Sequence, residues 1–151
     1  MRKALSGLST FKTLLCVVAA LTTLPFSHAQ NAGPVRIGVL APITGPLATP
    51  GAEMIDALKM FWEKNNNTVS GRKVELVIAD TTCNPDQALT QARRLALQEK
   101  VSFLLGPLCG HEGPAVAQVS KETGVPLILD PAGADTNTKW DRTPTVIRTA
   151  V

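Results

Sequence analysis

The densest group of chemically capable side chains is the run Cys109-Gly110-His111-Glu112. A cysteine beside a histidine could be the nucleophile and base of a hydrolase, if the cysteine is a free thiolate. These side chains could also bind zinc, but the sequence has neither an HExxH nor a CxxC spacing. A second cysteine, Cys83, is available to pair with Cys109. This favours a polar, ligand-contacting loop over an enzymatic or metal site.

A glycine-rich stretch is the other candidate for chemistry, because glycine loops can hold phosphate groups. Gly45 and Gly51 are separated by five residues and are followed by Ala52-Glu53. The P-loop needs four residues between its glycines and then lysine with serine or threonine, and the dinucleotide fingerprint is also absent. The sequence therefore predicts no nucleotide and no other cofactor.

The first 29 residues have the pattern of a secretory signal peptide. Basic residues at positions 2, 3 and 12 precede an apolar run of eleven residues, 14–24, and Ser27-His28-Ala29 has small residues where a signal peptidase cleaves. The run is shorter than the roughly 20 apolar residues that span a bilayer. We therefore expect cleavage after Ala29 and a periplasmic chain of residues 30–151; the alternative is an uncleaved anchor helix.

The expected mature chain carries no net charge, since its 12 basic and 12 acidic residues balance. A neutral chain has no electrostatic footprint for nucleic acid. It retains two cysteines, Cys83 and Cys109. An even pair in an oxidising compartment predicts a disulfide, with two buried free thiols as the alternative.

The hydrophobic pattern predicts alternating strands and helices. The expected strands are 35–41, 74–80, 101–105, 125–129 and a short one at 145–149. The expected helices run from Ala52 to about Asn65, from the Asn84-Pro85 start, and from Pro114 to Gly124. The inward face of the first helix should carry Met54, Ala57, Leu58 and Phe61, widened by Ile55 and Trp62. This alternation predicts an α/β fold with a doubly wound parallel sheet.

In such a sheet, ligands bind beyond the carboxyl ends of the strands. The connecting segments at those ends are 42–51, 80–84, 106–113 and 130–144. The third helix should begin at Gly113-Pro114, so that its free N–H groups and its dipole face the same crevice. A carboxylate on the ligand suits such a helix start.

Several stretches resemble a known family. They are VRIGVLAPITGPLATPG, GRKVELVIADTTCNPDQALTQARRLALQEKV, FLLGPLCG, and TGVPLILDPAGA followed by VIRTA. The chain is similar to type I periplasmic binding proteins, in the leucine/isoleucine/valine-binding family of ABC-transporter receptors. The resemblance implies a two-lobed receptor that closes around a small solute, an amino acid or organic acid, and delivers it to the membrane subunits of an ABC permease. Cys83 and Cys109 match the disulfide positions of the family.

Carried over by position, the resemblance implies a set of ligand contacts: Pro50, Gly110, His111, Ala132, Gly133, Ala134 and Asp135. Amino-acid binders of the family often have an aromatic residue at the position of Pro50, a serine at Gly110 and a threonine near Ala134. None of these is present, which favours an amide, an organic acid or an aromatic acid over an α-amino acid held in the usual way.

The resemblance also implies that residues 30–151 form only the front lobe, because the family is usually more than twice this long. We therefore expect a truncated chain without the second lobe. Two alternatives to a transport receptor are a ligand-sensing regulatory module of the same fold and a non-functional receptor fragment. A thiol titration separates these binding roles from a hydrolase that uses Cys109 and His111.

Overall fold

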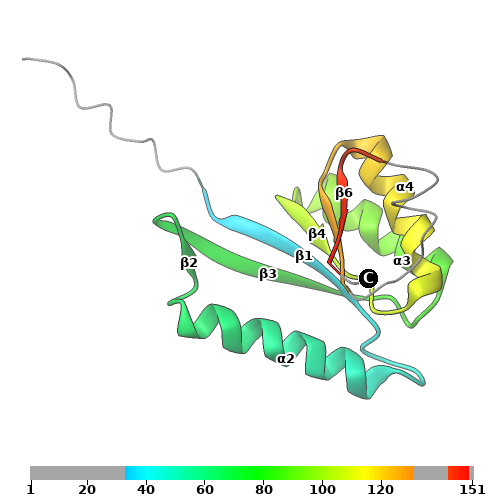
Figure 1. Ribbon diagram of the computed structural model, residues 1–151, viewed down its shortest axis with the longest axis horizontal. Coiled ribbons are helices and arrows are strands. Elements are labelled where there is room, and N and C mark those ends of the chain that lie inside the picture. Colours follow the sequence, from blue (N-terminus) through cyan, green and yellow to red (C-terminus); the bar gives the residue numbers. More distant parts are fainter. Residues whose placement is uncertain (1–32, 131–142, 150–151) are drawn as a thin grey trace, which may run out of the picture. The chain divides into compact units, whose positions relative to one another are not determined.

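The computed structural model describes residues 33–130 and 143–149 of the 151-residue chain. Its sheet has the strand order β2-β3-β1-β4-β5-β6 (Figure 1). Its strands are β1 (Val35–Ala41), β2 (Thr68–Val69), β3 (Arg72–Asp80), β4 (Phe103–Leu105), β5 (Leu127–Leu129) and β6 (Val146–Arg148). Every pairing is parallel except that of β2 with β3. The predicted α/β class with a mainly parallel sheet is confirmed.

The helices lie on both faces of this sheet. They are α2 (Ala48–Lys64), α3 (Pro85–Arg93) with a π-helical continuation η1 (Arg94–Gln98), and α4 (Gly113–Thr123), preceded by the 3-10 turn η2 (Gly110–Glu112). Helix α2 covers one face, and α3 and α4 lie on the other side (Figure 1). Within the described ranges, no helix combines the length and the apolar character needed to cross a membrane.

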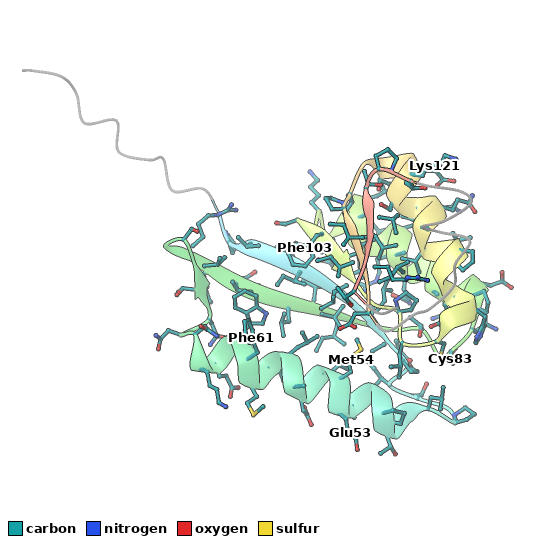
Figure 2. The ribbon with its side chains drawn as sticks, viewed as in Figure 1. Glu53, Met54, Phe61, Cys83, Phe103 and Lys121 are labelled. Atoms are coloured by element: carbon teal, nitrogen blue, oxygen red, sulfur yellow. A yellow bond between two sulfur atoms is a disulfide. The ribbon has the colours of Figure 1, made fainter. Side chains whose placement is uncertain are left out.

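One core layer lies between α2 and the sheet. Ile55 is buried against Ile37 and Val39, and Leu58 and Trp62 pack at its border. Met54 points from α2 toward the strands and Glu53 points away (Figure 2). The predicted inward positions Ala57 and Phe61 are wrong: both are exposed, Phe61 by 55%. The buried stripe instead follows positions 51, 55, 58 and 62, which share one helical face.

The second core layer lies under α3, η1 and α4. The alanines and Leu95 that were predicted to face inward are all buried there: Ala88, Ala92, Leu95 and Ala96. They meet Val116 and Val119 of α4 and Leu40 and Leu104 of the sheet. The small side chains of α3 let α3 and α4 pack closely against each other over this part of the sheet.

The strand register places the ends of neighbouring strands at one level. Ala41 at the end of β1 pairs with Asp80 at the end of β3, and Leu105 of β4 pairs with Ile128 of β5. The N–H of Thr81 donates to the carbonyl oxygen of Ala41 at 3.0 Å. The loops that follow these strands therefore leave the sheet from the same edge, as the crossover pattern predicted.

The first helix starts earlier than predicted. Helix α2 begins at Ala48, so Pro50 lies in its first turn instead of in a loop. Proline is tolerated there because the first N–H groups of a helix have no partner within the helix. The segment 65–71, expected to be only a turn, also contains β2, whose Thr68 pairs with Lys73 of β3.

Candidate functional site

The loop after β1 is held at the edge of the sheet by Asp80. One carboxylate oxygen of Asp80 accepts from the N–H of Ile43 at 2.8 Å, and the other accepts from the Thr44 hydroxyl at 2.6 Å. The N–H of Thr82 donates to the same carboxylate at 2.9 Å. Burial acts to raise the pKa of Asp80, but these hydrogen bonds together lower it. Asp80 thus joins the loops that follow β1 and β3.

Two glycines allow the backbone segments at this edge to approach each other closely. A Cβ on Gly51 would lie 1.8 Å from the carbonyl oxygen of Pro42, and a Cβ on Gly106 would lie 2.3 Å from that of Leu40. Gly106 also has a backbone φ of +103°, a conformation that residues with a side chain rarely adopt. The peptide bond between Gly106 and Pro107 is cis. These contacts fix where the loops after β1 and β4 begin.

A disulfide joins the loops after β3 and β4. Cys83 and Cys109 are bonded, with 5.7 Å between their Cα atoms, which confirms the predicted pair (Figure 2). Nε2 of His111 lies 3.0 Å from the carbonyl oxygen of Cys83, so an Nε2–H would donate to it. Because Cys109 is oxidised, it cannot supply the free thiolate that a hydrolase would need. Within residues 33–130 and 143–149, no group of three His, Cys, Asp or Glu side chains could hold a metal ion.

Helix α4 begins at Gly113, as predicted, but an unpredicted helical turn at Gly110 extends the stretch by three residues toward β4. The turn η2 comes first and runs directly into α4. The N–H of Glu112 donates to the Cys109 carbonyl and that of Gly113 to the Gly110 carbonyl. The first N–H groups of the continuous stretch formed by η2 and α4 therefore belong to Gly110 and His111. Helix geometry gives these two N–H groups no hydrogen-bond acceptor within the stretch. The prediction that assigned the free N–H groups to Gly113-Pro114 is wrong, although the helix start does lie at the predicted edge.

Glu112 is a residue of this edge to which the sequence pattern assigned no role of its own. Its side chain is 0% exposed. No hydrogen bond of regular geometry reaches either of its carboxyl oxygens or the hydroxyl of Thr81 among the described residues, although the Thr81 hydroxyl and the backbone of Cys109 and Asn84 lie beside the carboxyl. Burial raises the pKa of Glu112, while the nearby Thr81 hydroxyl, the backbone of Cys109 and Asn84 and the charge of His111 offset this only in part.

The structure brings only some of the predicted contact residues together. Gly110 and His111 form the start of η2, beside the disulfide. Pro50 lies on a different element, in the first turn of α2, which follows the loop from β1. The remaining predicted contacts, Ala132, Gly133, Ala134 and Asp135, lie outside the described residues.

Comparisons with known proteins agree with this arrangement. Residues 34–151 match the sequence model of the family described as periplasmic binding protein. The Leu/Ile/Val-binding protein BraC3 of Rhizobium johnstonii is 32% identical over 143 residues, which cover 93% of this chain and 37% of that protein.

Solved structures of ABC-transporter receptors share the fold. A substrate-binding protein from Sphaerobacter thermophilus superposes with a TM-score of 0.71 at 31% identity, over 76% of this chain and 32% of that one. A solute-binding protein of R. palustris in complex with benzoate gives 0.72 at 28% identity, over 77% and 32%. The chain thus spans about a third of the length of the relatives it matches. By sequence and by fold it belongs to the type I periplasmic binding proteins, in the branched-chain amino acid family, and corresponds to their N-terminal part.

Proposed function

We propose that this chain is the ligand-binding front lobe of a periplasmic solute-binding protein that captures a small carboxylate-bearing solute for an ABC permease. The observation that carries the proposal is the helix start at Gly110 and His111. It lies at the carboxyl edge of the sheet and is fixed there by the disulfide to the neighbouring loop. A ligand at this edge would meet backbone donors that are already in place before it arrives.

The chemistry of a helix start favours an anion. The aligned peptide dipoles place about half a positive charge at the first turn, where the N–H groups also point outward. Gly110 has no side chain to block the approach of a ligand to these N–H groups. His111 adds a ring whose Nε2 atom lies at the Cys83 carbonyl, which holds it beside the helix start.

The relatives fit the same class of solute. One is named for leucine, isoleucine and valine, and another was solved with benzoate, and all four compounds carry a carboxylate. In this chain Pro50 and Gly110 supply no side-chain hydroxyl or aromatic ring. We therefore propose an organic or aromatic acid, or an amide that also carries a carboxylate, ahead of an α-amino acid, with Ala132–Asp135 completing the contacts.

The proposed location is the periplasm. Residues 1–29 have the composition of a cleaved signal peptide, and the Cys83–Cys109 disulfide suits an oxidising compartment. The proposed partners are the membrane subunits of an ABC permease, because the solved relatives are receptors of such transporters.

Isothermal titration calorimetry of the oxidised chain tests the proposal. Benzoate is the first titrant, and benzamide is its control, since it has the same ring without the negative charge. Isoleucine tests the amino-acid alternative. We expect binding of benzoate and none of benzamide at equal concentration. Binding of isoleucine alone would overturn the preference for aromatic and organic acids, and binding of none of the three would contradict the carboxylate site.

A further inference from the structure

The buried carboxyl of Glu112 is the feature of this edge that the proposed solute site leaves unexplained. It belongs to the first turn of the same helical stretch that begins with Gly110 and His111. Its two oxygens are sealed from solvent and receive no hydrogen bond of regular geometry in the described part of the chain. A buried carboxylate without partners is strongly disfavoured, whereas a neutral carboxyl is tolerated at much lower cost.

We propose that Glu112 is a specificity-determining residue of the carboxylate site, because its complete burial favours the uncharged carboxyl, which leaves the positive helix start to an anionic solute. A charged Glu112 would cancel part of the positive potential at that helix start. It would also repel the carboxylate of a solute bound at Gly110 and His111. Binding of the solute and protonation of Glu112 therefore favour each other. This inference rests on the proposed function and adds to it a dependence on pH.

The other titratable groups on the elements packed around Glu112 do not replace it in this role. Asp80, at the end of β3, is engaged by the N–H groups of Ile43 and Thr82. Asp86, in the first turn of α3, is exposed to solvent. His111, on η2 itself, acts on Glu112 through its charge and lowers the pKa of Glu112. Of these groups, His111 lies closest in sequence to Glu112 and shares its turn, so the variant His111→Gln serves as its control.

The direction of the effect follows from burial. Burial raises the pKa of Glu112, so the proton remains bound up to a higher pH than in an exposed glutamate. As the pH rises through this raised pKa, Glu112 becomes charged and affinity for an anion falls, by at most about tenfold for each pH unit. Stability shows the same sign: the contribution of Glu112 is fully present below its unfolded pKa of about 4.3 and is lost through the raised folded pKa.

The experiment is urea unfolding of the oxidised full chain between about pH 5 and about pH 8, with and without benzoate, because a ligand that binds only the folded state stabilises it. The variants are Glu112→Gln, which keeps the shape without the charge, and Glu63→Gln, the matched control. Glu63 is an exposed carboxylate near the C-terminal end of α2. Isoleucine is measured in parallel as the second carboxylate probe.

We expect the dissociation constant of benzoate for the unmodified chain and for Glu63→Gln to rise roughly threefold or more over this range. In Glu112→Gln the constant should be independent of pH. Without ligand, the urea midpoint of unfolding should depend less on pH in Glu112→Gln than in the unmodified chain. In the control Glu63→Gln this pH dependence should be unchanged.

Other outcomes overturn the proposal in separable ways. A pH-independent constant in the unmodified chain, or a dependence that persists in Glu112→Gln, removes Glu112 from the role. A dependence abolished by His111→Gln assigns it to His111 instead. If Glu112→Gln does not fold, a dependence in the unmodified chain that survives His111→Gln still supports the proposal, and its absence overturns it. No stabilisation by benzoate or isoleucine in any variant would contradict the proposed function itself, and the coupling with it.

Discussion

Gly51 illustrates how a single residue sets the geometry of the proposed site. It lies in the first turn of α2, where the helix backbone touches the loop that leaves β1. Helix propensity alone predicts that Gly51→Ala stabilises the chain by about 1 kcal/mol. Because the new Cβ would lie 1.8 Å from the Pro42 carbonyl oxygen, we expect instead a loss of about 2 kcal/mol or more in the free energy of unfolding, measured in urea.

Gly33→Ala is the control for this substitution. Nothing lies within 4 Å of the position that its Cβ would take. Its free energy of unfolding should equal that of the unmodified chain within about 0.5 kcal/mol. If both alanine variants were equally stable, the close approach of α2 to the loop after β1 would be wrong.

Asp80 provides a second residue-scale prediction, in which pH is the variable. The hydrogen bonds from Ile43, Thr44 and Thr82 lower the pKa of Asp80 in the folded state. A lowered pKa contributes stability that is present above the unfolded pKa of about 3.9 and is lost as the pH falls through the folded value. We expect Asp80→Ala to cost about 1 kcal/mol near neutral pH and less in acid, by urea unfolding at several pH values.

The matched control for Asp80 is Asp56→Ala on α2. Asp56 makes one exposed ion pair, at 3.6 Å to Lys59, and such pairs contribute little. An equal loss in the two variants, or a loss at Asp80 that does not change with pH, would contradict the described role of Asp80 as the tie between two loops.

The candidate site was predictable from sequence where topology alone decides it. Gly110 and His111 follow a strand and precede a helix, so their place at the carboxyl edge follows from the crossover rule. Burial of Glu112 could not be predicted, because a glutamate two residues before the helix-opening Pro114 usually reads as an exposed residue at a helix start. The carboxyl lies beside Thr81 and Asn84, which follow β3 and are about 30 residues earlier in the chain.

Among the elements, α3 has the clearest sequence determinant. The side chain of Asn84 accepts hydrogen bonds from the N–H groups of Asp86 and Gln87, at 2.9 and 3.1 Å, and Pro85 follows as the first helical residue. We expect Asn84→Ala to lower the free energy of unfolding by about 1 kcal/mol, because two N–H groups lose their acceptor. Asn84→Ser, whose hydroxyl can cap the same turn, should remain close to the unmodified chain. Equal losses for alanine and serine would show that the cap has no such role.

Strand and helix positions were mostly predictable because burial imposes a period on the sequence. Strands β1 and β3 and the start of α3 fall where alternation and capping place them. The start of α2 could not be predicted, because a proline and a glycine at positions 50 and 51 are typical of a loop. The two-residue β2 was missed because Thr68 and Val69 lie between turn residues and are too few to show a period.

At the scale of the whole molecule, the disulfide is the main covalent constraint on the described fold. It closes a loop with a sequence separation of 26 residues, and chain entropy assigns such a loop about 3.5 kcal/mol. The double variant Cys83→Ala, Cys109→Ala should lose about this much stability. Reduction of the unmodified chain with dithiothreitol should cause a similar loss and should not affect the double variant. No loss from either treatment would mean that the two loops are held without the bond.

The architecture accounts for the family without fixing the solute. A mainly parallel sheet with helices on both faces creates a binding edge by topology, and relatives with this fold include a receptor named for branched-chain amino acids and one solved with benzoate. Under the proposed function, a few residues decide which solute binds, and those proposed in this chain are Pro50, Gly110, His111 and the buried Glu112.

The most direct test of the central claim is a titration of the ¹⁵N-labelled, oxidised chain with benzoate, followed by amide chemical shifts. We predict the largest shifts at the N–H groups of Gly110 and His111, with smaller shifts at Cys83 and Thr44 on the adjoining loops. Shifts confined to the opposite edge of the sheet, around Arg36 and Val101, or no shifts with any carboxylate tested, would contradict the claim that this helix start receives an anionic solute.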